Sequence, residues 1–167
     1  GRNFEYFSED PLLSGFMGAS IVNGIQSNEI GTSVKHFVAN NQETNRVLND
    51  VIVSDRAMHE IYLKGFEHIV KRSQSWTIMS SYNKINGVYT SESEWLLTNI
   101  LRNEWGFKGL VMTDWFGGKN SSSQISAGND LLEPGTNRQW KALTKAVKNE
   151  ELSMDAIDRA AKRILTL

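Results

Sequence analysis

Apolar residues recur along the chain with two different periods, and the two kinds of segment alternate. Short apolar runs typical of buried strands occur at 32–39, 76–82, 110–113 and, more briefly, within 128–135. Segments with apolar residues three or four positions apart lie at 11–26, 53–72, 91–105, 137–149 and 154–166. Strands that alternate with helices in this way predict an α/β fold whose parallel strands are joined by right-handed crossovers.

Several polar residues mark where the predicted elements begin and turn. Ser54 and Ser153 stand just before two of the helices and are expected to be their N-caps. Ser91 and Glu94 have the spacing of a capping box, in which each side chain bonds a backbone N–H at the start of the helix. Asn86-Gly87 predicts a tight turn after the second strand.

The number of strands limits the architecture. We count four parallel β-units in 167 residues, whereas a closed eight-stranded (β/α)8 barrel typically needs about 250 residues. The chain can therefore supply only part of such a barrel. We expect one partial domain over residues 1–167.

Composition narrows the function classes. The formal net charge is −1 and 40% of the residues are hydrophobic, which fits a globular domain and implies neither a nucleic-acid partner nor a membrane span. Cysteine is absent, so disulfides and thiolate metal sites are excluded. His59 and His68 are nine positions apart, on opposite faces of their helix, and no glycine-rich phosphate loop occurs. We therefore expect no metal and no cofactor.

The stretch from Gly109 to Gly118 combines a strand with a candidate reactive group. Its apolar run ends in Asp114, Trp115 and, soon after, two glycines. Ligands of parallel α/β folds bind at the carboxyl ends of the strands, so a carboxylate there is well placed for chemistry. The alternative is that Asp114 only caps a helix or closes a turn.

The other strands end in polar sets of their own. Lys35 and His36 end the first strand and Arg46 follows in its loop, while Tyr82 ends the second. If the strands lie side by side, these donors converge with Asp114 on one pocket, where they would hold several hydroxyls of a polyol and keep the carboxylate ionised. Each also has a plainer interpretation, as a solvated cation, a core histidine or a packed aromatic ring.

Together these residues resemble glycoside hydrolase family 3, in particular its β-glucosidase branch. The similarity covers essentially the whole chain and is carried by four blocks with preserved spacing: GRNFE with SEDP at 1–11, KHF with NNQETNR at 35–46, MSSYN at 79–83, and WGFKG with TDW at 105–115. The family implies that the chain is the later, C-terminal part of an N-terminal TIM-like barrel. An upstream barrel half and a following domain would then lie outside it.

The resemblance also implies roles. Asp114 matches the nucleophile of a retaining glycosidase, which forms a covalent glycosyl-enzyme intermediate with terminal β-linked glucose or a related sugar. Trp115 matches an aromatic wall of the site. The positions expected to bind the sugar are Arg2, Lys35, His36, Arg46 and Tyr82.

One catalytic group is missing from the matched motifs. A retaining enzyme needs a second carboxyl group as general acid/base, and in β-glucosidases of this family a Glu from the following domain supplies it. Two alternatives stay open: a sugar-binding remnant without catalysis, and a lyase that uses Lys35 as a Schiff-base amine.

The adjacent pair Lys35-His36 carries a geometric prediction. Neighbouring side chains on a regular strand point to opposite faces, yet both residues are expected to reach one sugar. We therefore predict a backbone distortion at this bond, for which a cis peptide is one form.

Overall fold

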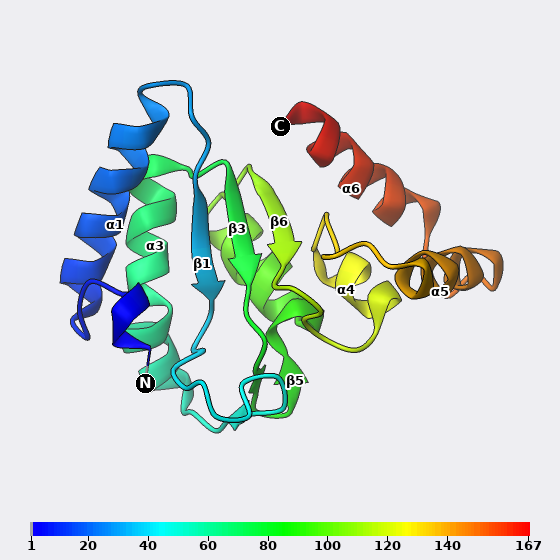
Figure 1. Ribbon diagram of the computed structural model, residues 1–167, viewed down its shortest axis with the longest axis horizontal. Helices are drawn as coiled ribbons and strands as arrows, with labels where there is room; N and C mark the ends of the chain where they lie inside the picture. Colours follow the sequence, from blue (N-terminus) through cyan, green and yellow to red (C-terminus); the bar gives the residue numbers. More distant parts are fainter. Residues whose placement is uncertain (1) are drawn as a thin grey trace.

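A computed structural model describes residues 2–167, and within them three parallel strands form the central sheet (Figure 1). The strands are β1 (Ser33–Phe37), β3 (Thr77–Ser80) and β6 (Leu110–Thr113), in the order β1-β3-β6. All three run in one direction, so their carboxyl ends lie at the same edge of the sheet. The α/β class and the three longer predicted strands are confirmed.

The fourth predicted strand is reduced to a single residue pair. Leu131 forms one parallel bridge with Met112, and within residues 2–167 this bridge does not extend into a strand of two or more residues. The side chain of Asn129, just before the bridge, is buried and donates to the carbonyl of Ser91, which ties this segment to the 3-10 turn that contains Ser91. Pro134, which has no N–H to add to a ladder, follows soon after.

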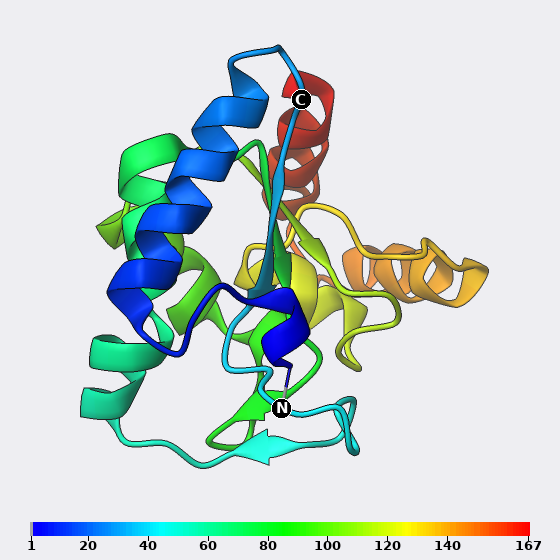
Figure 2. The same cartoon turned by 60° about the vertical axis from the view of Figure 1, so that its left-hand side comes forward.

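The first two helical segments lie side by side along one flank of the sheet (Figures 1 and 2). They are α1 (Pro11–Gln26) and α3 (Lys64–Ser73). The helix predicted at 53–72 begins as α2 (Asp55–Ala57) and passes through a π-helical stretch, η2 (Met58–Tyr62), before α3. Ser54 is its N-cap, as predicted, because its hydroxyl accepts a hydrogen bond from the Ala57 N–H at 3.3 Å.

The capping box predicted at Ser91 and Glu94 is wrong. Ser91 belongs to a separate 3-10 turn, η3 (Thr90–Glu92), and the following helix, η4 (Trp95–Glu104), is π-helical. The Ser91 hydroxyl is fully buried and accepts a hydrogen bond from the Gln124 side chain at 3.2 Å, so it is engaged in a tertiary contact instead.

A small second sheet lies near the carboxyl edge of the first. It joins β2 (Asp50–Val51), β4 (Lys84–Ile85) and β5 (Val88–Tyr89) in that order. The turn between β4 and β5 is the predicted one: Asn86 and Gly87 both have positive φ, 48° and 91°, as a type I′ hairpin requires.

The last third of the chain forms a helical unit with its own core. It comprises α4 (Ser121–Ala127), α5 (Asn137–Lys148) and α6 (Met154–Thr166). The predicted cap Ser153 accepts a hydrogen bond from the Ala156 N–H at 3.3 Å. The apolar side chains that pack between these helices include Ile125, Leu132, Ala146, Leu152, Ala156 and Ala160.

The main core fills the space between the sheet and the helices α3 and η4. Its members are wholly or almost wholly buried apolar side chains, among them Phe37, Leu63, Val70, Ile78, Leu97, Leu101 and Val111. Burying each such side chain contributes about 1.5–3 kcal/mol relative to leaving it exposed. The sheet therefore has a well-packed face behind the edge at which its strands end.

A buried carboxylate ties the helical unit to the sheet. Asp130 accepts hydrogen bonds from the Val111 N–H at 2.9 Å, from Arg102 Nη2 at 2.7 Å and from Arg163 Nη1 at 2.8 Å. The three partners come from β6, η4 and α6. Burial lowers the pKa of Arg102 to about 10 despite the opposing charge of Asp130, so the guanidinium remains charged at neutral pH.

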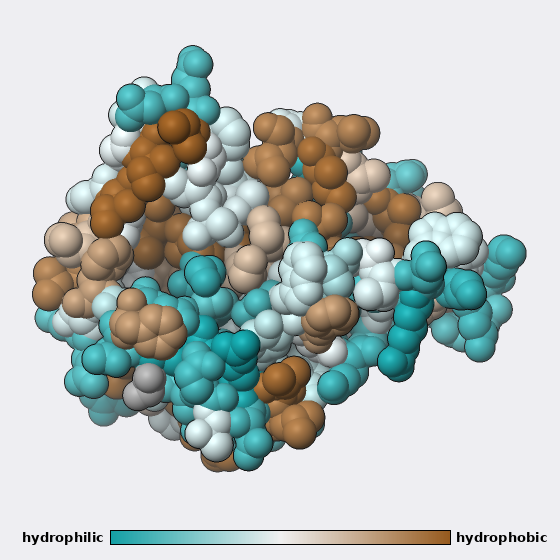
Figure 3. Space-filling view, viewed as in Figure 1, coloured by the Kyte–Doolittle hydropathy of each residue, from teal (hydrophilic) through white to brown (hydrophobic). Residues whose placement is uncertain are grey.

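The surface divides into apolar and polar regions. Figure 3 shows apolar surface over α1 and α6, where exposed side chains include Met17, Ile21, Ile164 and Leu165, and mostly polar surface below the strand ends. Within residues 2–167, no helix is both long enough and apolar enough to cross a membrane.

Close packing of α1 on α3 gives a first prediction. A Cβ at Gly15 would lie 2.7 Å from the Cβ of His68, whereas a Cβ at Gly24 of the same helix would meet nothing within 4 Å. We expect Gly15→Ala to reduce the free energy of unfolding by about 1–3 kcal/mol through overpacking. Gly24→Ala is the matched control and should raise it by up to about 1 kcal/mol through helix propensity. Denaturant unfolding measures both, and equal effects of the two variants would contradict the packing argument.

Candidate active site

Asp114 is the first residue beyond β6 and its position is set by the sheet. Its N–H donates to the Ser80 carbonyl at 3.1 Å, which continues the β3–β6 ladder, and its carbonyl accepts from the Gly117 N–H at 2.8 Å. The Trp115 N–H donates to Asp114 Oδ1 at 2.7 Å. A hydrogen bond of this kind stabilises the negative charge and leaves Oδ2 free to face the neighbouring strands.

His36 lies between Asp114 and Lys35. Its Nε2 is 3.4 Å from Asp114 Oδ2 and 3.2 Å from Lys35 Nζ, and the ring is almost fully buried. The Lys35-His36 peptide is cis, which confirms the predicted distortion. The His36 N–H donates to the Tyr6 hydroxyl at 3.2 Å. The two adjacent side chains of β1 therefore end beside one another.

The N-terminal turn supplies charged groups to the same place. It consists of η1 (Asn3–Glu5) with Arg2 before it, and it lies beside the carboxyl end of β1 (Figure 2). Arg2 is buried and pairs with Glu5 at 2.7 Å, while the second oxygen of Glu5 is 3.1 Å from Nδ1 of His36. Glu5 thus connects Arg2 to His36.

The loop after β1 closes the arrangement on its other side. Glu43 forms ion pairs with both Arg2 and Arg46, at 2.5 and 2.8 Å. The Arg46 guanidinium also lies over the ring of Tyr82, 5.0 Å from its centroid. Burial, followed by the charge and hydrogen bonding of Asp114, raises the pKa of Tyr82, so its hydroxyl remains protonated beside the carboxylate.

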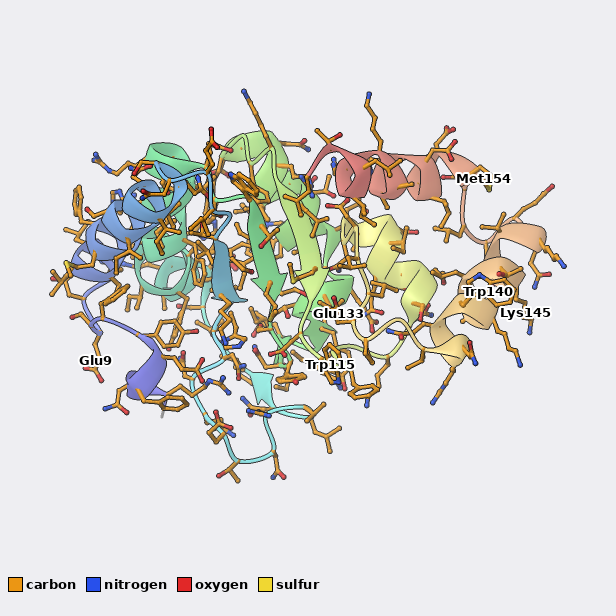
Figure 4. The ribbon with its side chains drawn as sticks, turned by 45° about the horizontal axis from the view of Figure 1, so that its top comes forward. Glu9, Trp115, Glu133, Trp140, Lys145 and Met154 are labelled. Atoms are coloured by element: carbon orange, nitrogen blue, oxygen red, sulfur yellow. The ribbon has the colours of Figure 1, made fainter. Side chains whose placement is uncertain are left out.

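Two aromatic rings stand at the outer rim. Trp115 and Phe116 are each more than half exposed and meet edge to face, with centroids 6.1 Å apart. Their loop is held by Glu133, which lies beside Trp115 in Figure 4: its carbonyl accepts from the Phe116 N–H, and its N–H donates to Thr113 Oγ1. Trp115 therefore presents an apolar face to solvent next to the charged cluster.

The electrostatics keep the histidine neutral and the nearby glutamate ionised. Burial and the charge of Lys35 hold the pKa of His36 below its ordinary value, although Asp114 and Glu5 oppose this. Burial alone would raise the pKa of Glu5, but the hydrogen bond from Arg2 and the positive charges of Arg2 and Lys35 bring it below its ordinary value.

The structure brings the predicted site residues together. His36 and Trp115 contact Asp114 directly, and the ion pairs of Glu5 and Glu43 connect His36 to Arg2 and Arg46. The structure also removes the helix-cap alternative for Asp114, because the N-cap of the next helix is Asn120. Two contributors escaped the sequence reasoning: Glu5, noted there only as part of a motif, and Glu43, for which no motif gave a role. In the part of the chain described, no cluster of three or more His, Cys, Asp or Glu side chains could hold a metal ion.

These features define an α/β protein with a carboxylate-centred polar site at the carboxyl edge of a parallel sheet. Residues 1–167 match the family described as "Glycosyl hydrolase family 3 N terminal domain". The chain belongs to this family, as its motifs indicated.

Relatives and solved structures agree with this membership. The chain is 47% identical to an exo-α-(1→6)-L-arabinopyranosidase of Bifidobacterium longum and 46% identical to the thermostable β-glucosidase B of Acetivibrio thermocellus, over 100% and 99% of its length. It matches β-glucosidase 3B from Thermotoga neapolitana in complex with glucose, with a TM-score of 0.96, 52% identity and 99% coverage. The chain spans only 22% of each of the two enzymes and 24% of the structure.

The lowered pKa of His36 predicts how stability depends on pH. Below its ordinary pKa of 6.5 the unfolded chain takes up a proton that the folded site resists, so stability should fall as the pH drops from about 7 toward the folded pKa. We expect His36→Asn to flatten this part of the melting-temperature profile. His59→Asn, at an exposed histidine outside the site, is the control and should keep the wild-type slope. An unchanged slope in His36→Asn would refute the argument.

Proposed function

We propose that the whole protein containing this chain is a retaining glycoside hydrolase that releases terminal β-linked glucose or a related sugar. The observation that carries the proposal is the setting of Asp114. Its Oδ1 is held by the Trp115 N–H, while Oδ2 faces His36 Nε2 at 3.4 Å among groups able to bind hydroxyls. Family membership supports the same reaction class.

In the first step Asp114 attacks the anomeric carbon. A bond forms between its carboxylate oxygen and that carbon as the bond to the leaving group breaks, and a general acid protonates the departing oxygen. In the second step water, deprotonated by the same group, displaces Asp114 and releases the sugar. The backbone of Asp114 is fixed because its N–H donates to the Ser80 carbonyl and its carbonyl accepts from the Gly117 N–H. Its carboxylate is therefore held in place for both steps.

The sugar is proposed to lie against the groups around Asp114, with Trp115 as an apolar wall beside it. Cationic and phenolic donors suit sugar hydroxyls, and the proposed binding residues are Arg2, Lys35, His36, Arg46 and Tyr82. The glucose complex of the Thermotoga enzyme supports glucose as the sugar. The arabinopyranosidase relatives make L-arabinopyranose the related sugar to compare.

We further propose that the strands described here are the later part of a barrel and that a following domain supplies the acid/base Glu. A retaining mechanism requires that second carboxyl group at about 5–5.5 Å from the nucleophile. The 22–24% of the relatives' length that the chain spans leaves room for both an upstream barrel half and such a domain.

The lyase alternative has less support. A Schiff-base lysine is normally desolvated or otherwise activated as a neutral amine, whereas Lys35 is exposed and hydrogen-bonded to His36. Borohydride reduction in the presence of an aldehyde substrate would trap a secondary amine on Lys35, and we expect none. The sugar-binding remnant differs from the hydrolase only in turnover, so the labelling experiment below separates them.

Covalent labelling tests the nucleophile. We expect incubation of the whole protein with an activated 2-deoxy-2-fluoro-β-glucoside to add one glycosyl group, which peptide mapping places on Asp114. The good leaving group reduces the need for the general acid, and the fluorine slows the second step.

Two variants complete the labelling experiment. Asp114→Asn should abolish the adduct and lower kcat on 4-nitrophenyl β-glucoside by at least about 10³-fold. Asp158→Asn, which removes an exposed carboxylate on α6, should be labelled like the wild type. An adduct on another residue would overturn the role of Asp114, and a folded protein that binds glucose without labelling would be a binding remnant.

A further inference from the structure

Glu5 is placed where it can organise two of the proposed sugar-binding residues at once. One carboxylate oxygen, Oε1, accepts a hydrogen bond from Arg2 Nη2 at 2.7 Å. The other, Oε2, lies 3.1 Å from Nδ1 of His36. Only 17% of the Glu5 side chain is exposed, so the carboxylate sits between its partners with little access to water.

The contact between Glu5 and His36 brings together two buried polar atoms that lack hydrogen bonds. Nδ1 of His36 and Oε2 of Glu5 are both buried, and neither makes a hydrogen bond within residues 2–167, although the two atoms lie 3.1 Å apart. Leaving a buried polar group without a partner costs about 1–3 kcal/mol, and more for a charged group. A proton on Nδ1, facing the lone pairs of Oε2, would give each atom the partner that it lacks.

We propose that Glu5 is a positioning residue of the site: its carboxylate fixes the proton of His36 on Nδ1 and holds the Arg2 guanidinium in place. The proposal rests on the proposed hydrolase function. Glu5 acts through its two partners and needs no contact with the sugar or with the reacting atoms.

The placement of the proton on Nδ1 determines what the other ring nitrogen can do. Nε2 then carries a lone pair, which accepts the hydrogen bond from the Lys35 ammonium at 3.2 Å. Asp114 Oδ2, 3.4 Å away, faces an uncharged imidazole and not a cation that would pair with the nucleophile. The carboxylate of Asp114 stays available for attack while His36 is neutral.

The charges that surround His36 come from three parts of the chain. Lys35 precedes it on β1, Asp114 faces it from the loop after β6, and Arg2 and Glu5 face it from the N-terminal turn. The negative charge of Glu5 raises the pKa of His36, whereas the positive charge of Lys35 lowers it. Removing the charge of Glu5 should therefore lower the pKa of His36 further.

Glu43 lies in a more open setting. It also bridges two arginines, Arg2 and Arg46, but 46% of its side chain is exposed, and so is 40% of that of Arg46. Ion pairs that are this exposed contribute about 1 kcal/mol or less. Glu5 is the more buried of the two acids and contacts a residue that itself touches Asp114.

The test is the steady-state kinetics of Glu5→Gln in the whole protein, with 4-nitrophenyl β-glucoside as substrate. Loss of the charged contacts to Arg2 and His36 should reduce kcat/KM about 10- to 100-fold. We expect protonation of His36 to set the acid limb of kcat/KM, and this limb should therefore move to lower pH in Glu5→Gln. A purely structural role of Glu5 would not move that limb.

Matched variants separate charge from position. Glu9→Gln removes the same charge from an exposed residue on the same N-terminal segment, far from Trp115 in Figure 4, and should behave like the wild type. Glu5→Asp keeps the charge but is too short to reach both partners. It should retain the wild-type acid limb and lose at least fivefold in kcat/KM.

Clear outcomes would overturn the proposal. A folded Glu5→Gln protein whose kcat/KM is within threefold of wild type, or whose acid limb is unmoved, shows that Glu5 does not position the site. If Glu5→Gln does not fold, Glu5→Asp decides: activity within twofold of wild type overturns the proposal.

A parallel measurement distinguishes this failure from failure of the proposed function. If Asp114→Asn retains wild-type turnover, or the wild type does not hydrolyse the substrate, the hydrolase proposal is wrong whatever Glu5 does. Glucose titration by calorimetry then tests Glu5 by itself. Glu5→Gln should weaken glucose binding at least fivefold, and equal affinity would refute the positioning role.

Discussion

The site depends on main-chain pairing that continues past the ends of the parallel strands. The Ser81 N–H donates to the Phe37 carbonyl at 2.8 Å, and the Asp114 N–H donates to the Ser80 carbonyl at 3.1 Å. These bonds carry the ladder one residue beyond the ends of β3 and β6. Residues separated by nearly eighty positions in the chain are thereby brought to one edge. The buried Asp130, bonded to Val111 N–H, holds the other side of β6 to the helical unit.

Much of this edge could be predicted because local patterns and one topological rule suffice for it. A buried-strand pattern that ends in Asp114, together with parallel pairing, places the carboxylate where ligands bind. The same rule brings Tyr82 and His36 beside it. A backbone distortion at Lys35-His36 could be expected because two adjacent strand residues had to reach one ligand, and the structure shows it as a cis peptide. The sugar-binding roles came from family motifs and not from physical reasoning alone.

The parts that escaped prediction depend on tertiary contacts without a local signal. Glu5 meets His36, and Glu43 meets Arg2, only when the N-terminal turn and the loop after β1 fold over the strand ends. Ser91 has the spacing of a helix cap, but burial against Gln124 overrides it. The apolar run around Leu131 is typical of a strand. Within residues 2–167 only one bridge forms there, because the side chains of Asn129 and Asp130 are buried in other contacts and Pro134 follows.

The balance of charges in the site determines how strongly ionic strength affects the association of a sugar. Within residues 2–167, the charged side chains linked to neutral His36 are three basic and three acidic ones, namely Arg2, Lys35, Arg46, Glu5, Glu43 and Asp114. Opposite charges this close cancel at distances beyond the Debye length, about 8 Å at physiological ionic strength. An uncharged sugar is then neither attracted nor repelled from afar, so ionic strength should leave its association almost unchanged. A sugar analogue bearing an amine would be attracted by the nearest carboxylate, that of Asp114, only once it lies within the site.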